Sequence, residues 1–334
     1  MERFVFVVAV AIAIMFGIVA ITGGPHWSNF GIHIDGDDEG GTAPIVATSA
    51  GTMAAETFPG EEISIRNLAA IVTITPEDRT DFVVEIDNNA GQLPMPTVSA
   101  DEDGVRIDGQ LRGRVRDCGD GGHARVRGYG DEEFDAAELP RITIRAPRAL
   151  RVDRGGAGTT EIGASQALNL DVRGCSTTTI GDVAGELAID VSGSGDVNAG
   201  ATQSLSADVR GSADVVVGAV TSGATLDISG SGSVTMASLA GELTSDERGS
   251  GSVTVQGGAI TVANIDLSGS GDVTIGATVQ DLDVSIRGSG GVSVTAAVVN
   301  IDADITGSGS VTAASATGRI HQEVRGSGEV SVGQ

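Results

Sequence analysis

One short phrase, repeated through the second half of the chain, decides its fold: SGSGDV at residues 192–197, RGSADV at 210–215 and SGSGSV at 229–234. We call the first residue of each phrase the hook. Other hooks, two of them in degenerate copies, are Arg154, Arg173, Arg248, Ser268, Arg287, Thr306 and Arg325. Successive hooks lie 18 to 20 residues apart. A constant period near 20 residues is typical of a solenoid, so the repeat predicts about ten stacked coils of roughly 19 residues each.

Apolar and polar residues alternate on both sides of the phrase, with the period of a β-strand. Apolar residues stand just before the hook, as at Val191, and at the end of the phrase, as at Val197. We expect one strand to enter each corner and another to leave it, with these apolar side chains facing the core. Glycine follows the hook in all ten coils, from Gly155 to Gly326. A corner between two strands often needs a φ above zero, which a Cβ opposes.

The region before the repeat, residues 58–150, reads as a strand-rich cap over the first coil of a solenoid that spans residues 151–334. We expect its strands near residues 62–66, 70–74, 82–86, 105–107 and 142–145. The last coil has no evident cap, and a strand edge leaves backbone groups unpaired. We therefore expect a second copy of the chain, or another partner, to cover that coil.

Residues 4–22 form an uncharged, mostly apolar run, close to the roughly 20 residues of a membrane-spanning helix. A cleaved signal peptide usually has a shorter apolar region that ends at small residues, and VAI at residues 19–21 matches that site poorly. We favour an uncleaved transmembrane anchor over residues 1–23, with a cleaved signal as the alternative. Arg3 precedes the run, so the positive-inside rule leaves the rest of the chain outside the cytoplasm. Residues 24–57 read as a flexible linker.

Charged residues form two columns along the predicted solenoid. The outward column two positions before the hook is mostly acidic, and the hooks alternate between Arg and Ser or Thr from Arg173 to Arg325. Stacked carboxylates repel by roughly 1 kcal/mol per pair in water. The column has about one Arg for every two acids, so each Arg can offset the charge of two carboxylates. We interpret the columns as a self-compensating surface ladder. The alternative is weak Ca²⁺ binding, with candidate ligands Asp190, Asp208, Asp227, Asp246 and Asp266.

The two cysteines, Cys118 and Cys175, fit no metal-binding spacing. In an oxidising compartment they are expected to form a disulfide, and two free thiols are the alternative. Cys175 stands in the position after a corner glycine, near the cap. A basic, glycine-rich stretch lies around Cys118, and we expect it to be a solvated loop rather than an anion-binding one. Its basic residues are Arg112, Arg114, Arg116, Arg125 and Arg127.

Composition excludes some classes of function. A net charge of −25 argues against binding nucleic acid, whose phosphates such a surface repels. Residues 150–334 contain no Phe, Tyr or Trp, and their acids form a regular column rather than a local cluster. Both features disfavour a polysaccharide-cleaving enzyme, the main alternative, and we expect no catalytic residue and no cofactor. Ice binding through the outward threonine column is a minor alternative.

The repeated SGSGDV and RGSGSV phrases, with the strand-rich stretches at residues 58–66, 71–74 and 139–150, resemble the head GIN domain of putative auto-transporter adhesins. The resemblance covers about residues 58–334. It implies a right-handed parallel β-helix on bacterial cell envelopes and carries over no catalytic residue.

The function expected from these features is a non-enzymatic, membrane-tethered envelope protein with a structural or adhesive role. Its partner would be an envelope or surface polymer or a protein. The solenoid would lie in the periplasm or outside, anchored in the inner membrane, or be secreted if residues 1–23 are cleaved. A polysaccharide-active enzyme and a Ca²⁺-binding surface repeat protein are the alternatives.

Overall fold

The computed structural model describes residues 47–101, 104–118, 124–128 and 133–333. Within these ranges the chain forms strands and loops, and none of them contains a helix long and apolar enough to cross a bilayer. The predicted anchor, residues 1–23, and most of the predicted linker lie outside the described ranges. The structure places a strand, β1 (Gly51–Pro59), where residues 51–57 were predicted to be linker. The strand-rich part therefore begins earlier than the pattern indicated.

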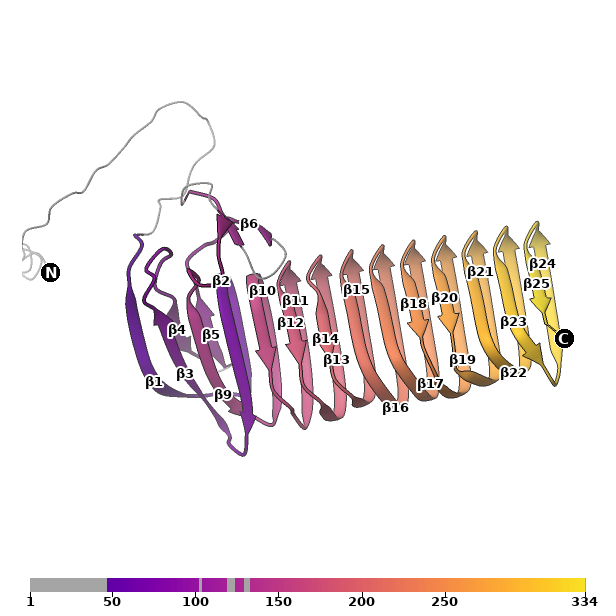
Figure 1. Cartoon of the computed structure of the whole chain (residues 1–334), viewed down its shortest axis with the longest axis horizontal. Helices are drawn as coiled ribbons and strands as arrows, with labels where there is room; N and C mark the ends of the chain where they lie inside the picture. Colours follow the sequence, from indigo (N-terminus) through magenta and orange to yellow (C-terminus); the bar gives the residue numbers. More distant parts are fainter. Residues whose placement is uncertain (1–46, 102–103, 119–123, 129–132, 334) are drawn as a thin grey trace, which may run out of the picture. The chain divides into compact units, whose positions relative to one another are not determined.

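From Ala149 onward the described chain is a parallel β-solenoid whose coils stack along one axis (Figure 1). Equivalent residues of successive coils pair directly, for example Val191 with Val209. Side chains therefore form straight columns, as the repeat predicted. The strands are β10 (Ala149–Ile162), β11 (Ala167–Gly174), β12 (Thr177–Ile180), β13 (Val183–Gly193), β14 (Val197–Ala199), β15 (Thr202–Gly211), β16 (Asp214–Gly230), β17 (Ser233–Gly249), β18 (Ser252–Val255), β19 (Gly258–Gly269), β20 (Asp272–Ile275), β21 (Thr278–Gly288), β22 (Gly291–Gly307), β23 (Ser310–Ala316), β24 (Ile320–Gly326) and β25 (Glu329–Val332).

The solenoid core consists of aliphatic columns that face inward from these strands. Val191, before a hook, and Val197, after one, are fully buried. Leu239, farther along its coil, is also buried. Thr274, between the buried Val273 and Ile275, is exposed. Each coil buries its apolar side chains against its neighbours, which lets the chain fold without aromatic residues in this part.

The corners of the solenoid require glycine for two reasons. Gly230 and Gly269 have φ angles of 129° and 141°, a region that side chains with a Cβ rarely adopt. A Cβ on either residue would also lie within 3.0 Å of the carbonyl oxygen of the equivalent glycine in the preceding coil. The next residue closes the corner, as where Ser231 N–H donates to Gly211 O at 2.8 Å. The predicted role of the glycine is confirmed.

The strands that precede Ala149 extend the parallel stack. β2 (Glu62–Glu77) pairs in parallel with β10, and also with β5 (Val105–Asp108) and β9 (Arg141–Pro147). In this sheet, the outer strands β1, β3 (Asp81–Asn88) and β4 (Thr97–Ala100) pair antiparallel with their neighbours. β2 was predicted as two strands. It is one strand with a bulge, where Asn67 has a φ of 52°.

The first coil departs by one residue from the predicted register. β10 pairs with β11 so that Gly155, and not Arg154, lies beside the hook Arg173. The corner glycine of this coil is Gly156, with a φ of 109°. Arg154 instead lies in the inward column and is fully buried. The predicted hook at Arg154 is wrong because the degenerate copy RGGA has two consecutive glycines, either of which could mark the corner, and no serine or cysteine after the first one.

The basic stretch within the cap is a small sheet rather than a solvated loop. β6 (Val115–Cys118), β7 (Ala124–Val126) and β8 (Glu133–Phe134) pair in antiparallel order. Buried Leu111, Val126 and Phe134 belong to a cluster that includes Ala157 of β10. This packing holds the sheet over the corners of the first coils.

Candidate functional site

The predicted ion-pair ladder is present on the outer surface. The hook Arg210 binds Asp208 of its own coil and Asp190 of the preceding coil, at 3.1 Å. The alternation of arginine and small hook residues continues into the cap, because Gly155 is the small residue of the first coil and Arg66 lies in the strand before it. The sequence pattern missed this continuation because it misplaced the hook at Arg154.

The five aspartates considered as Ca²⁺ ligands all belong to this ladder. Each forms an ion pair with a hook arginine: Asp190 and Asp208 with Arg210, Asp227 and Asp246 with Arg248, and Asp266 with Arg287. Among the described residues, no three acidic, His or Cys side chains gather in a group that could hold a metal ion. Ca²⁺ binding stays a prediction, in which the cation would compete with the arginines.

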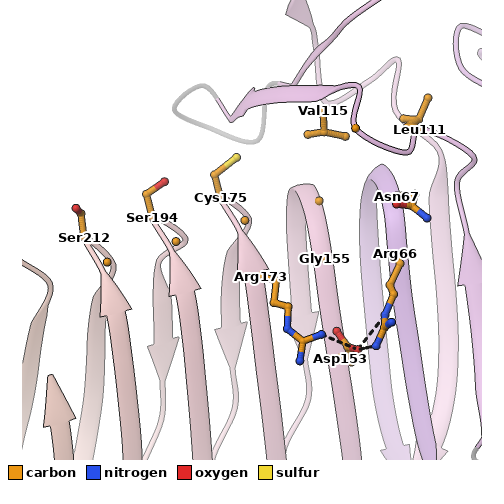
Figure 2. Close-up of a pocket in the computed structure, with 15 residues that line it drawn as sticks. Arg66, Asn67, Leu111, Val115, Asp153, Gly155, Arg173, Cys175, Ser194 and Ser212 are labelled. Carbon is orange, nitrogen blue, oxygen red and sulfur yellow. Dashed lines mark hydrogen bonds and ion pairs between the residues drawn. The ribbon is translucent and has the colours of Figure 1, made fainter. Parts of the chain in front are cut away.

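Asp153 differs from the other acids of the column because it is buried and shared by two arginines. Its side chain is 7% exposed, against 43% for Asp190. Its Oδ2 accepts a 3.0 Å hydrogen bond from Nε of Arg66 and a second from Nη2 of the same residue, and lies 3.6 Å from Nη1 of Arg173 (Figure 2). The hydrogen bonds to Asp153 raise the pKa of Arg66. Both guanidiniums are thereby held in place.

The second oxygen of Asp153, Oδ1, is buried and has no hydrogen-bond partner among the described residues. A buried acceptor without a partner is costly, typically by about 1–3 kcal/mol. A small movement that exposes Oδ1 to a ligand hydroxyl would therefore be compensated by a hydrogen bond.

This cluster stands at one end of a groove with a volume of about 700 Å³. Its floor is the row of corner glycines, including Gly156, Gly174, Gly193 and Gly211. Val115 of the small sheet and Leu111 of the loop before it lie above the floor (Figure 2). The groove occurs where the cap insertion covers the corners, and the later coils lack such a cover among the described residues.

The residues after the corner glycines form a row along the groove. Cys175, Ser194 and Ser212 come from three consecutive coils and point the same way (Figure 2). Cys175 thus lies in the serine column, as predicted, and it is disulfide-bonded. The side chain of Cys118 lies outside the described residues, so the pairing of Cys118 with Cys175 stays a prediction.

The chemistry of the groove is that of hydrogen bonding. Its lining offers two guanidiniums, a carboxylate, the Asn67 amide and the hydroxyls of Ser194 and Ser212. Among the described residues that line it, none is aromatic and none is a histidine that could act as a base toward a hydroxyl nucleophile. Such a surface can exchange hydrogen bonds with a polar ligand.

Arg154 supports the groove from within the core. Its guanidinium donates to Oγ1 of Thr160 at 3.0 Å, to the carbonyl of Gly155 at 2.6 Å and to the carbonyl of Ala157 at 2.5 Å. Burial lowers the pKa of Arg154 to about 10. These bonds tie together the backbone that forms the first corner of the floor.

A third buried charge-bearing residue, Glu247, interrupts the core far from the groove. It occupies the inward column between Ile228 and Leu267 of the adjacent coils and is 2% exposed. Ser245 Oγ lies 3.5 Å from its Oε1, and its Oε2 has no partner among the described residues. Burial raises the pKa of Glu247 to about 7, and the charge of Asp272 adds to this shift. The repeat pattern did not identify this residue, although the sequence DER at residues 246–248 has a glutamate at the position before the hook, where most of the other coils have an apolar residue.

Comparison with known proteins identifies one matching family. The family described as "Putative auto-transporter adhesin, head GIN domain" matches residues 117–220 and 224–333, which is well over half of the chain. No curated protein matches the chain.

Several crystal structures are similar at low identity. One, described as a "putative lipid binding protein" from Parabacteroides distasonis ATCC 8503, is 17% identical, with 87% of this chain and 100% of that one covered and a TM-score of 0.45. A "putative adhesin" from the same organism is 16% identical, with 86% and 100% covered and a TM-score of 0.44. A "putative adhesin" from Parabacteroides merdae ATCC 43184 is 14% identical, with 87% and 100% covered and a TM-score of 0.40.

Proposed function

Because this chain belongs to the putative auto-transporter adhesin, head GIN domain family, we propose that it is a non-enzymatic binding module of the bacterial cell envelope. Its ligand is a neutral, hydroxyl-rich polymer, such as an envelope or surface polysaccharide, bound in the covered groove at the first corners. The apolar run at residues 4–22 tethers the solenoid to the membrane. The family description names adhesins and no enzyme.

The observation that carries this proposal is the groove, where the regular solenoid acquires a cover and a buried acid. Farther along the ladder, the acids that pair with Arg210, Arg248 and Arg287 are 32% to 61% exposed. In the groove, Arg66 and Arg173 are held by Asp153, which is 7% exposed and whose buried Oδ1 has no partner among the described residues. Guanidinium donors beside a carboxylate acceptor suit the vicinal hydroxyls of a sugar, which both donate and accept hydrogen bonds.

Two features favour a linear and uncharged ligand. The polar row repeats once per coil, about every 4.8 Å, so a chain-like ligand can lie along it. The net charge of −25 repels polyanions, and the two arginines of the groove are already neutralised by Asp153 and Asp171. The glycine floor lets the ligand approach the backbone closely.

A substitution that fills the groove tests whether it is the binding site for the polysaccharide. Ser194→Gln adds a bulky polar side chain to the groove, and Ser289→Gln makes the same change at the equivalent corner of a later coil, which has no cover. Binding of the purified chain to a panel of neutral polysaccharides should fall at least tenfold for Ser194→Gln, a loss of about 1.4 kcal/mol. Ser289→Gln should bind as the parent does.

Two results would contradict the proposal. One is the absence of binding to any neutral glycan in the panel, and the other is an equal effect of both variants. The release of reducing ends or unsaturated uronates, measured on the same samples, would instead indicate the polysaccharide-active alternative.

A further inference from the structure

The last coil of the solenoid presents an open core. Ile320 and Val324 of β24 continue the inward columns of Ile301 and Ile305. Those two isoleucines are 1% and 0% exposed, whereas Ile320 and Val324 are 46% and 38% exposed. Among the described residues, β24 and β25 each pair on one side only, with β22 and β23. This end face therefore offers both apolar side chains and unpaired backbone groups.

The opposite end of the stack is protected against such pairing. β1 pairs with β3 through a register shift between Met53 and Glu56, and it ends at Pro59, which has no N–H to donate. Bulges and prolines are the usual ways of blocking an edge strand. β24 and β25 contain no proline and pair without a register shift. The C-terminal face, unlike the β1 edge, is built like a strand edge that can accept another strand.

We propose that this C-terminal face docks on the same face of a second copy of the chain, with the two β24 strands pairing antiparallel about Val324. In that register Val324 lies opposite Val324 of the partner subunit, so the two open cores cover each other. Each Glu323 lies opposite the Arg325 of the other copy.

The charges of β24 favour this partner. Arg325 binds Glu323 of its own strand and Asp304 of the preceding coil, at 3.4 Å, and both Glu323 and Arg325 are more than half exposed. The two-fold axis would bring together two acids and two arginines that alternate in sign. Such complementarity offsets part of the repulsion between two chains that each carry a charge of −25. Because the same face of each copy forms the contact, the assembly closes as a two-fold dimer and does not grow into a fibre.

Charge reversal tests both the partner and the register. The full chain and its variants would be studied by sedimentation velocity in one detergent at physiological ionic strength, over a wide range of concentrations. Any association through residues 4–22 is common to all variants. Arg325→Glu and Glu323→Arg each place like charges opposite one another, and each should raise the dimer dissociation constant about tenfold or more.

The double variant, Glu323→Arg with Arg325→Glu, restores opposite charges and should dimerise again. An equimolar mixture of the two single variants should form the mixed dimer. Circular dichroism and melting curves of each variant confirm that the solenoid is folded, which is expected because both side chains are exposed.

A parent chain that is monomeric apart from its detergent-bound segment would overturn the proposal. So would single variants that associate like the parent, or a double variant that fails to recover. The groove plays no part in this association, so glycan binding and dimerisation can fail independently.

Discussion

The buried carboxyl of Glu247 makes the stability of this solenoid depend on pH. The pKa of Glu247 rises from 4.5 to about 7 in the folded chain because the side chain is buried among aliphatic columns. The folded state therefore holds this proton more tightly than the unfolded state. Between these two pH values the unfolded chain releases the proton while the folded chain keeps it. The contribution of Glu247 to the free energy of unfolding is thus most favourable below pH 4.5 and falls as the pH rises to 7.

The size of the effect follows from the shift. A difference between 4.5 and about 7 corresponds to about 3 kcal/mol, which is a large share of the stability of an ordinary domain. Glu247→Gln removes the titration and keeps the shape. The free energy of unfolding of the parent relative to Glu247→Gln should decline by about 3 kcal/mol between about pH 4 and pH 8.

Denaturant unfolding followed by far-UV circular dichroism across this pH range measures the difference. Asp246→Asn is the matched control, because Asp246 is the adjacent residue but faces outward and pairs with Arg248. It should leave the pH dependence of the parent unchanged in this range. Glu247→Leu, which matches the column of Ile228 and Leu267, should be more stable than the parent at pH 8. Parallel curves for the parent and Glu247→Gln would refute the reasoning.

Three further changes test the coils themselves. Val253→Asp places a carboxylate in the fully buried column and should lower the free energy of unfolding by more than about 4 kcal/mol. Thr254→Asp, on the outer side, should leave cooperative unfolding intact. Similar melting of the two variants would contradict the inward and outward columns. Gly269→Ala meets both a φ of 141° and the carbonyl of Gly249, and should lower the free energy of unfolding by about 2–4 kcal/mol. Gly257→Ala is its control, since the nearest atom to an added Cβ is 4.0 Å away, and equal losses in the two variants would argue against the corner geometry. Arg154→Lys loses the planar set of three hydrogen bonds and should lower the denaturant midpoint by an amount equivalent to about 2 kcal/mol. An unchanged midpoint would mean that Arg154 does not stabilise the corner glycines that form the floor of the groove.

Much of the candidate site was beyond the reach of the sequence. The repeat placed Cys175 in the row of corner residues and predicted the arginine and acid columns. It did not reveal that the small sheet β6–β8 covers the first corners, because that packing depends on Leu111 and Phe134 meeting Ala157 across the chain. With the hook misplaced at Arg154, Asp153 fell outside the predicted acid column, and its burial arises only when Arg66 of β2 lies beside it.

The sequence by itself determined the coil: its length, its inward columns, its glycine corners and its ladder of charge. These are local properties, because alternation and glycine placement act within one repeat and stacking simply multiplies them. Tertiary structure alone decided where the regularity ends. The register of the first coil, the buried states of Arg154 and Glu247, and the covered groove all depend on which neighbour packs against a given strand. A repeated phrase carries no information about a neighbour that occurs only once.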